Sequence, residues 1–293
     1  MENIDFGKTF KQIRKDRGLT LEEVSYNVMS RSTLSDFENK NKDIRFSNMR
    51  GLLDNMNMAY YEMLYIHNEF ELNKVQSVWQ QILKYYNERN ISALKSLLKR
   101  LEAEYGESEI KSIYDRLNYL QWKNIVSKLD KKYRLSRVEG KEIADYLLRL
   151  TYWNTYDTTL FINVLEIFKT ERLVELSNLI IRKTSQFEEI PSHKQMIVVL
   201  LSNTANQLIS RGEFCEGQKF LKQAEERVSE MEVYERLRLN FIRGELEYAE
   251  GDVSEGIKKM EFVMETFRGL GCHFIADGFQ EDYERTKEKF KKA

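Results

Sequence analysis

Proline and glycine are scarce in this chain of 293 residues, which contains one proline and 13 glycines. A β-rich protein of this length needs turn residues at short, regular intervals, so their scarcity favours long helices. Long apolar runs are also lacking, because the longest, residues 196–201, has only six residues and cannot cross a bilayer. We therefore expect an all-α protein with no membrane partner.

Cysteine and histidine are scarce as well. Cys215 and Cys272 are too few for a disulfide framework, and the amino terminus lacks the basic and apolar regions of a signal peptide. These features indicate a cytoplasmic location, and we expect both cysteines to pack as small apolar side chains. The three histidines show no metal-ligand spacing, and the chain has neither a glycine-rich phosphate loop nor a nucleophile elbow. We therefore predict no catalytic residue, no metal site and no cofactor.

The most specific motif lies near the amino terminus, where five short helices can be recognised. An apolar stripe through Phe10 and Ile13 marks the first helix, which ends at Gly18. Thr20 is expected to cap the second helix, and Glu23 completes a capping box three residues later.

The third helix is expected over residues 31–39, with Leu34 and Phe37 facing inward. Ser47 is expected to cap a fourth helix, and a fifth spans residues 60–67. The inward positions leave one basic and four hydroxylated side chains at the start of the third helix facing outward. These are Ser30, Arg31, Ser32, Thr33 and Ser35.

Residues 6–66 resemble the XRE-type, lambda-repressor-like DNA-binding domain of five helices. The resemblance rests on two segments, Leu19-Thr20-Leu21-Glu22-Glu23-Val24 and Ser30-Arg31-Ser32-Thr33-Leu34-Ser35-Asp36-Phe37-Glu38. It implies that the third helix enters the major groove, that Glu38 braces the domain, and that cations of the following loop meet phosphates. The implied DNA-binding residues are Ser30, Arg31, Ser32, Thr33, Ser35, Lys40, Lys42 and Arg45.

Two positions depart from the pattern of that domain. Leu21 stands where a glutamine usually contacts a phosphate, and Asp36 stands where an arginine is common. An acid beside the DNA backbone lowers affinity or selects a cytosine amino group. Residues 1–66 also hold ten Lys/Arg and ten Asp/Glu, so non-specific attraction to DNA is expected to be modest and sensitive to salt.

The rest of the chain shows helical patterns throughout and an internal repeat. The segment Gly-Glu-Phe-Cys-Glu-Gly at 212–217 recurs as Gly-Asp-Val-Ser-Glu-Gly at 251–256, an offset of 39 residues. Each copy ends one helix at a glycine and starts the next with an acid, as the turn of a helical hairpin does. A period near 40 predicts stacked hairpins, expected at residues 74–105, 109–149, 155–187, 193–229 and 233–268, with a capping helix at 274–291.

These hairpins resemble a degenerate tetratricopeptide-like array, a right-handed α-solenoid in which Ala205, Gly212 and Ala224 let helices pack closely. The first helices of such pairs line a concave face suited to an extended peptide. Amide side chains there can bond a peptide backbone of any sequence, and an arginine can bind a carboxylate. The expected peptide-binding residues are Tyr156, Asn163, Val199, Asn203, Asn206, Asn240 and Arg243.

The two parts together resemble the Rgg regulators, which are related to the PlcR, PrgX and ComR type of peptide-sensing factor. The resemblance implies a DNA-binding domain at residues 1–67 and a repeat domain at 68–293 that dimerises and senses a peptide. It implies a cytoplasmic homodimer that binds an inverted repeat in double-stranded DNA. Entry of a short hydrophobic peptide into the concave face then changes its state.

Two alternatives keep the same fold. Leu21 and Asp36 can mark a domain that has moved to protein interaction, with the repeats acting as an adaptor. In the other alternative the protein binds DNA, but the repeats serve dimerisation only. Failure to retain DNA at low salt would favour the first, and calorimetric titration with short hydrophobic peptides tests the second.

Overall fold

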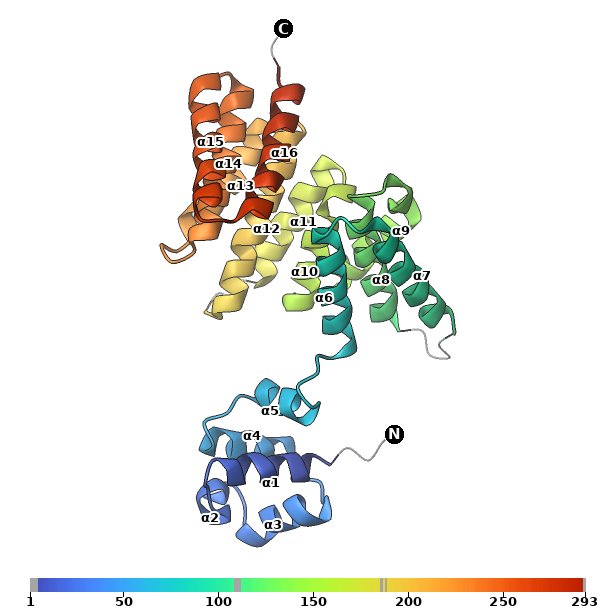
Figure 1. The fold of residues 1–293 in the computed structure, drawn as a ribbon, viewed down its shortest axis with the longest axis vertical. Coiled ribbons are helices and arrows are strands. Elements are labelled where there is room, and N and C mark those ends of the chain that lie inside the picture. The colour runs from blue at the N-terminus through green and yellow to red at the C-terminus, as the bar shows by residue number, and fades with distance from the viewer. Residues whose placement is uncertain (1–4, 108–111, 185–186, 188, 292–293) are drawn as a thin grey trace. The chain divides into compact units, whose positions relative to one another are not determined.

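The all-α expectation is confirmed. The structure, a computed structural model, describes residues 5–107, 112–184, 187 and 189–291, and over these the chain forms helices and no strand (Figure 1). The chain divides into two compact units, Met1–Leu83 and Lys84–Ala293, and each is described by itself. The boundary near residue 67 drawn from the sequence remains a prediction.

The first unit begins with the five short helices expected from the sequence. They are α1 (Phe6–Asp16), α2 (Leu21–Ser25), α3 (Arg31–Lys40), α4 (Phe46–Asn55) and α5 (Tyr60–His67). The expectation that Ser47 caps α4 is wrong. The helix already begins at Phe46, with Arg45 at the N-cap and no side-chain cap, so Ser47 lies within the first turn.

One apolar core holds these five helices together. Its buried members are Phe10, Ile13, Val24, Leu34, Phe37, Met49, Leu52, Leu53, Met56, Met58 and Met63. The rings of Phe10 and Phe37 meet edge to face at 5.7 Å, which ties α1 to α3. Gly7 lies against the Phe37 carbonyl, where any Cβ would collide with the backbone of α3. Leu21 also packs against this core.

The helix α6 (Lys74–Asn87) runs from the first unit into the second. The second unit then continues with ten α-helices over its described residues. They are α7 (Ile91–Glu107), α8 (Ile113–Ser127), α9 (Arg137–Arg149), α10 (Thr155–Val164), α11 (Thr170–Thr184), α12 (Pro191–Ser210), α13 (Phe214–Arg227), α14 (Val233–Glu250), α15 (Val253–Gly269) and α16 (His273–Lys289). Two 3-10 helices, η1 (Lys131–Tyr133) and η2 (Leu165–Ile167), follow α8 and α10.

The bounds of α6 to α16 agree closely with the bounds expected from the sequence, whereas the arrangement of all five pairs as one solenoid stays a prediction. The expected start of the second hairpin, residue 109, lies outside the described residues. Successive packing contacts join α8 to α10, α10 to α12, α12 to α14 and α14 to α16, so these five helices form one stacked row. We call them the inner helices. The closest packing lies within two hairpins, α12 with α13 and α14 with α15.

Both glycine turns of the internal repeat are confirmed. Gly212 and Gly251 have φ angles of 85° and 116°, a region that favours glycine. Gly251 directly follows the last residue of α14, and Gly212 lies two residues after the last residue of α12. The expectation that Gly212 lets helices pack closely is wrong, because a Cβ there would meet nothing within 4 Å. The close approach occurs at Gly217 instead, where a Cβ would lie 2.7 Å from a side-chain carbon of Ile209.

Candidate DNA interface and inner polar face

The first turn of α3 is exposed. Leu34 and Phe37 are buried in the core, which fixes the rotation of the helix. Arg31, Ser32 and Thr33 lie on the exposed side, as the sequence predicts. The helix therefore presents one guanidinium and two hydroxyl groups to solvent near its amino-terminal end.

The hydroxyl groups of this turn contact one another. Ser30 is the N-cap, and its Oγ accepts a hydrogen bond of 3.1 Å from the backbone N–H of Thr33. The same Oγ lies 2.9 Å from the Ser32 Oγ and 2.7 Å from the Thr33 Oγ1. Hydroxyl hydrogens rotate freely, so this cluster can offer a donor or an acceptor to a base edge or a phosphate.

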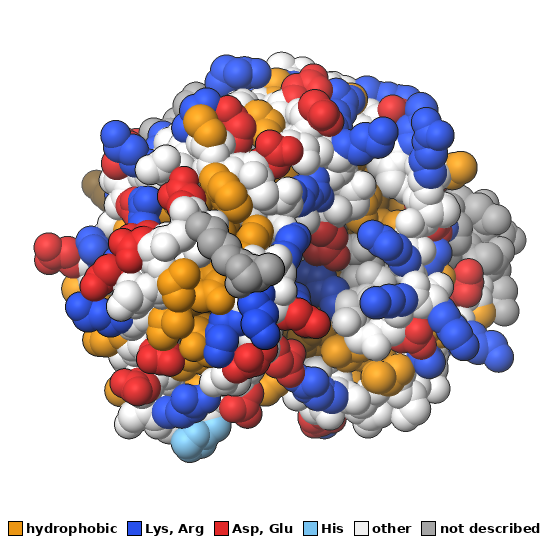
Figure 2. Space-filling view, turned by 90° about the horizontal axis from the view of Figure 1, so that it is seen from above, with side chains coloured by type: hydrophobic (Ala, Val, Ile, Leu, Met, Phe, Trp, Pro, Cys, Tyr) orange, Lys and Arg blue, Asp and Glu red, His pale blue; other side chains and the backbone are white. Residues whose placement is uncertain are grey.

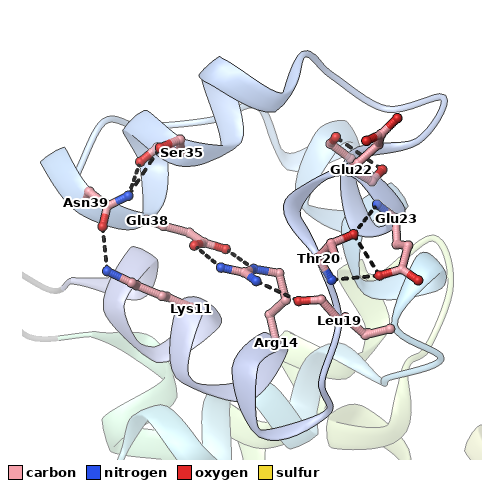
Figure 3. A network of polar contacts seen from close by, with 10 residues as sticks. Lys11, Arg14, Leu19, Thr20, Glu22, Glu23, Ser35, Glu38 and Asn39 are labelled. Atoms are coloured by element: carbon pink, nitrogen blue, oxygen red, sulfur yellow. Dashed lines mark hydrogen bonds and ion pairs between the residues drawn. The ribbon is translucent and has the colours of Figure 1, made fainter.

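A buried ion pair holds α3 against α1 (Figure 3). Arg14 Nε and Nη2 each donate to one carboxylate oxygen of Glu38 at 2.7 Å, and Nη1 donates to the Leu19 carbonyl at 2.7 Å. Glu38 is only 2% exposed, and its hydrogen bond to Arg14 raises the pKa of the guanidinium. A bidentate pair fixes both position and orientation. The bracing role that the resemblance implies for Glu38 is confirmed.

A second polar link joins the same two helices (Figure 3). Lys11 Nζ donates to Asn39 Oδ1 at 2.5 Å, and Asn39 Nδ2 donates to the carbonyl and the hydroxyl of Ser35. Ser35 is half-buried and turned toward its own helix, unlike the three residues of the first turn. The predicted capping box of Thr20 and Glu23 is also present and starts α2.

Asp36 neutralises part of the predicted phosphate-binding surface. Its two carboxylate oxygens accept from Lys40 Nζ at 2.7 Å and from Lys42 Nζ at 2.6 Å. These hydrogen bonds lower the pKa of Asp36 to about 2, so the acid is ionised at neutral pH. Two of the three cations assigned to the loop are therefore paired within the protein, while Arg45 is exposed at the N-cap of α4. The i, i+4 spacing of Asp36 and Lys40 is a sequence signal that could have revealed this pair.

Figure 2 shows one face of the molecule, on which basic and acidic side chains are both exposed. Lys and Arg side chains are mixed with Asp and Glu over the left part of this view and outnumber them over the right part, and hydrophobic side chains lie between the charged ones. Where charges of both signs are mixed at such close range, their fields largely cancel beyond a Debye length.

The predicted peptide-binding residues belong to α10, α12 and α14, three successive inner helices. Asn163 Nδ2 donates to Gln121 on α8 at 3.2 Å, and its carbonyl accepts from Asn124 Nδ2 at 2.9 Å. Tyr156 is half-buried, and its hydroxyl has no hydrogen-bond partner. Burial raises the pKa of this phenol.

On α12, the two predicted asparagines face α14. Asn203 Oδ1 accepts from Arg238, and Asn206 Nδ2 donates to Glu245 Oε2 at 2.7 Å. Val199 on α12 and Asn240 on α14 are half-buried.

Arg243 lies apart from this group. Its Nε and Nη2 pair with the two carboxylate oxygens of Glu225 on α13, at 3.2 and 2.6 Å. The structure therefore brings Asn203 and Asn206 together at the contact between α12 and α14, whereas Arg243 lies against α13, the second helix of the preceding hairpin.

The sequence reasoning missed Glu245, a carboxyl group buried between three inner helices. Its Oε1 accepts from Thr286 Oγ1 on α16 at 2.9 Å, while Oε2 accepts from Asn206 on α12. Burial raises the pKa of Glu245 to about 7. One signal was available, because Phe241, Glu245 and Tyr248 follow the i, i+4, i+7 spacing of a buried stripe.

One of the two cysteines differs from the expectation that both pack as apolar side chains. Cys215 is exposed, so it does not pack as an apolar residue, whereas Cys272 is half-buried against the core of α14–α16. His193 is buried and stacks on Phe187 with ring centroids 5.0 Å apart. Within the described ranges no three His, Cys, Asp or Glu side chains come together as a metal-ligand set. No helix of that part of the chain combines the length and apolar character needed to cross a membrane.

Comparison with a family model decides what kind of protein this is. Residues 71–281 match the model described as the C-terminal domain of the HTH-type transcriptional regulator Rgg, which is well over half of the chain. The chain belongs to the Rgg family of transcriptional regulators. Residues 71–281 of this Rgg protein therefore correspond to the C-terminal domain of a family of transcriptional regulators.

Solved structures share the fold of this Rgg protein over nearly its whole length. A proposed transcriptional regulator from Listeria monocytogenes EGD-e has a TM-score of 0.79 at 19% identity, covering 98% of this chain and 99% of that one. The SHP pheromone receptor Rgg2 of Streptococcus dysgalactiae has a TM-score of 0.77 at 21% identity, covering 96% and 99%. A complex of PrgX with cCF10 has a TM-score of 0.70 at 16% identity, covering 98% and 93%.

Proposed function

We propose that this Rgg protein binds an inverted repeat in promoter DNA as a homodimer, with one α3 in the major groove of each half-site. The observation that carries the proposal is the exposed first turn of α3 on a scaffold braced by Arg14 and Glu38. A single recognition helix reads too few base pairs for useful specificity, so a two-fold dimer suits the task. In this proposal residues 1–67 bind DNA, residues 68–293 dimerise, and the protein acts in the cytoplasm.

The second part of the proposal is that a short hydrophobic peptide regulates DNA binding. The inner helices carry amide side chains at their mutual contacts, among them Asn163, Asn203 and Asn206. Such groups can bond an extended backbone, while neighbouring apolar side chains select its sequence. The similar Rgg2 is a pheromone receptor and PrgX has been solved in complex with cCF10, which supports a peptide as the ligand class.

The DNA part is tested by a gel shift with the duplex upstream of the protein's own coding sequence. We expect Arg31→Ala to weaken binding about tenfold or more, because one bidentate contact to guanine contributes about 1–3 kcal/mol. Arg50→Ala, which removes an exposed arginine from α4, is the matched control and should bind like the parent. Equal affinity of the Arg31→Ala variant and the parent would remove the assignment of α3.

The peptide part is tested by calorimetric titration with short hydrophobic peptides. Binding by the parent, weakened by Asn203→Ala but not by Asn178→Ala on α11, is the expected pattern. A protein that binds DNA but no peptide would support the alternative in which the repeats only dimerise. Loss of DNA binding even at low salt, together with a protein partner in a pull-down, would support the adaptor. The observation that favours the adaptor is the pairing of Asp36 with Lys40 and Lys42 within the protein.

A further inference from the structure

A basic surface lies where η1 leads into α9. Residues 131–138 hold four cations and no acid. Lys131 and Lys132 belong to η1, Arg134 directly follows it, and Arg137 is the first residue of α9. All four residues are exposed, and we call them the η1 surface. Lys and Arg side chains outnumber acidic ones over the right part of Figure 2, the side on which α7, α8 and α9 lie in Figure 1.

The acids that flank the η1 surface pair with other cations. Asp130 accepts from Lys95 Nζ on α7 at 2.6 Å, and Glu139 accepts from Lys123 Nζ on α8 at 2.7 Å. The hydrogen bond from Lys95 is the main cause that lowers the pKa of Asp130, and the charge of Lys132 contributes less. Among the side chains that the structure describes, no carboxylate forms an ion pair with any of the four cations within 4.0 Å. The η1 surface therefore keeps most of its positive charge.

Contacts with α7 hold η1 in place. Asp130 is the N-cap of η1 and accepts from the backbone N–H of Lys132 at 3.0 Å, while its other carboxylate oxygen accepts from Lys95. Lys95 Nζ also lies 5.9 Å from the centre of the Tyr133 ring. A segment that is already ordered loses less conformational entropy when it binds a partner. This anchoring distinguishes the η1 surface from a mobile charged loop.

The position of Arg137 is one that the local fold does not favour. A cation in the first turn of a helix interacts unfavourably with the positive end of the helix macrodipole. The capping box of Ser136 and Glu139 already satisfies the backbone at this end of α9. The Arg137 guanidinium thus gives α9 no electrostatic stabilisation, and it is exposed to a partner outside the chain.

We propose that the η1 surface binds the phosphate backbone of duplex DNA. Exposed lysines and arginines contact phosphates whatever the base sequence, and duplex DNA presents phosphates in a dense, regular array. The inference rests on the proposed function, since the duplex is the one that α3 is proposed to read. It adds that the repeat domain supplies non-specific affinity. The first unit has little to spare, because Asp36 pairs with Lys40 and Lys42.

The salt dependence of DNA binding tests this proposal. Fluorescence anisotropy measures the affinity of the full chain for a duplex of random sequence over a range of salt. In Lys131→Gln/Lys132→Gln/Arg134→Gln we expect the slope of log K against log salt to become shallower by about two to three, because each phosphate contact contributes about 0.9. The affinity itself should fall at least about tenfold near physiological salt. An unchanged slope would overturn the proposal.

The matched control removes the same net charge from another part of the second unit. Lys219, Lys222 and Lys258 are exposed, and each pairs with an acid three or four residues away. Lys219→Gln/Lys222→Gln/Lys258→Gln should therefore keep the slope of the parent. An equal loss of slope in both triple variants would show that net charge alone is responsible, and the η1 surface would lose its assignment.

A single variant covers the case in which the first triple variant does not fold. Arg137→Gln removes a cation from the amino-terminal end of α9, a change that the helix macrodipole favours. It should make the slope shallower by about one. A slope equal to that of the parent in this folded variant would count against the proposal.

The η1 surface and the assignment of α3 can fail separately. If Arg31→Ala binds the upstream duplex like the parent while the η1 triple variant loses slope, the assignment of α3 falls and the η1 surface stands. The reverse pattern removes the η1 surface alone. Vesicles containing phosphatidylglycerol and polyglutamate test the other anionic partners. If the triple variant loses binding to either one but keeps its slope for DNA, a membrane or an acidic protein replaces DNA as the partner and the proposal is wrong.

Discussion

Asp36 lies on α3 four residues before Lys40, and both Lys40 and Lys42 donate to its carboxylate. The three side chains together carry one positive charge in place of two. Phosphate contacts supply most of the non-specific affinity of a DNA-binding protein, so under the proposed function this acid lowers the affinity for any duplex. In the proposed dimer, a low affinity of each copy for DNA makes stable binding depend on two half-sites.

Replacement of Asp36 by asparagine should release both lysines. We expect affinity for any duplex to rise several-fold, and the dependence of log K on log salt to become steeper by about one to two. Fluorescence anisotropy between about 50 and 200 mM salt measures both quantities, because lysine–phosphate contacts are lost over this range of salt. Asp43→Asn, which removes an exposed acid from the adjacent loop, is the control. A loss of affinity in Asp36→Asn, confined to sites with a particular cytosine, would show instead that Asp36 reads a base.

At the scale of the elements, the packing of α1 against α3 depends on the ion pair of Arg14 and Glu38. Removing one member of a buried pair leaves the other charge without compensation, which typically costs about 3–5 kcal/mol. We expect Arg14→Met to destabilise the first unit by that amount. Hydrogen exchange of the α1 and α3 amides in the full chain measures the loss.

The double variant Arg14→Met/Glu38→Leu is the matched control for that change. It removes both charges and should regain most of the lost stability, because well-packed apolar replacements of buried pairs are often neutral. Protection factors in Arg14→Met equal to those of the parent would show that the pair does not brace α3.

The hairpin of α14 and α15 depends on a glycine. A Cβ at Gly256 would lie 2.6 Å from the Gly244 carbonyl oxygen and from the Tyr248 backbone nitrogen. Gly256→Ala should therefore cost about 1–3 kcal/mol through overpacking. Gly278→Ala on α16, where a Cβ meets nothing within 4 Å, should instead stabilise by about 0.5–1 kcal/mol. Urea denaturation compares the two, and a change of the same sign in both would refute the packing argument.

Sequence patterns predicted correctly those features that depend on residues close together in the chain. The Thr20 capping box and the Gly212 and Gly251 turns depend on residues a few positions apart, and the structure contains each of them. Contacts between distant segments were harder to foresee. Arg243 pairs with Glu225, 18 residues earlier, and Glu245 meets Thr286, 41 residues later. Helical periodicity places a residue on a face of its helix, but it does not say which neighbouring helix covers that face.

At the scale of the whole molecule, Glu245 links stability to pH. Its pKa rises from 4.5 to about 7 on folding because it is buried. Below pH 4.5 the carboxyl group is protonated in both states and imposes no penalty. Between about pH 4.5 and pH 7 the unfolded chain loses the proton first, so the free energy of unfolding falls as pH rises. The full penalty, on the order of 3 kcal/mol, applies above pH 7.

The Glu245→Gln variant should remove this dependence. It is expected to be about as stable as the parent at pH 5 and more stable by up to about 3 kcal/mol at pH 8. Urea unfolding of the second unit at both pH values makes the comparison, with Glu250→Gln as the control. A difference between variant and parent that is the same at pH 5 and pH 8 would contradict the assignment of the titration to Glu245.

The amide contacts between the inner helices have a thermodynamic consequence for any molecule that enters between them. Asn163 is bonded to Gln121, and Asn206 is bonded to Glu245, before a ligand arrives. An incoming backbone must exchange these bonds for its own and gains few in total, so the enthalpy of hydrogen bonding nearly cancels. Net affinity then comes from burial of apolar side chains, and its signature is a negative heat-capacity change. On such a surface many sequences of similar hydrophobicity compete, and discrimination depends on the few positions where shape or charge forbids the exchange.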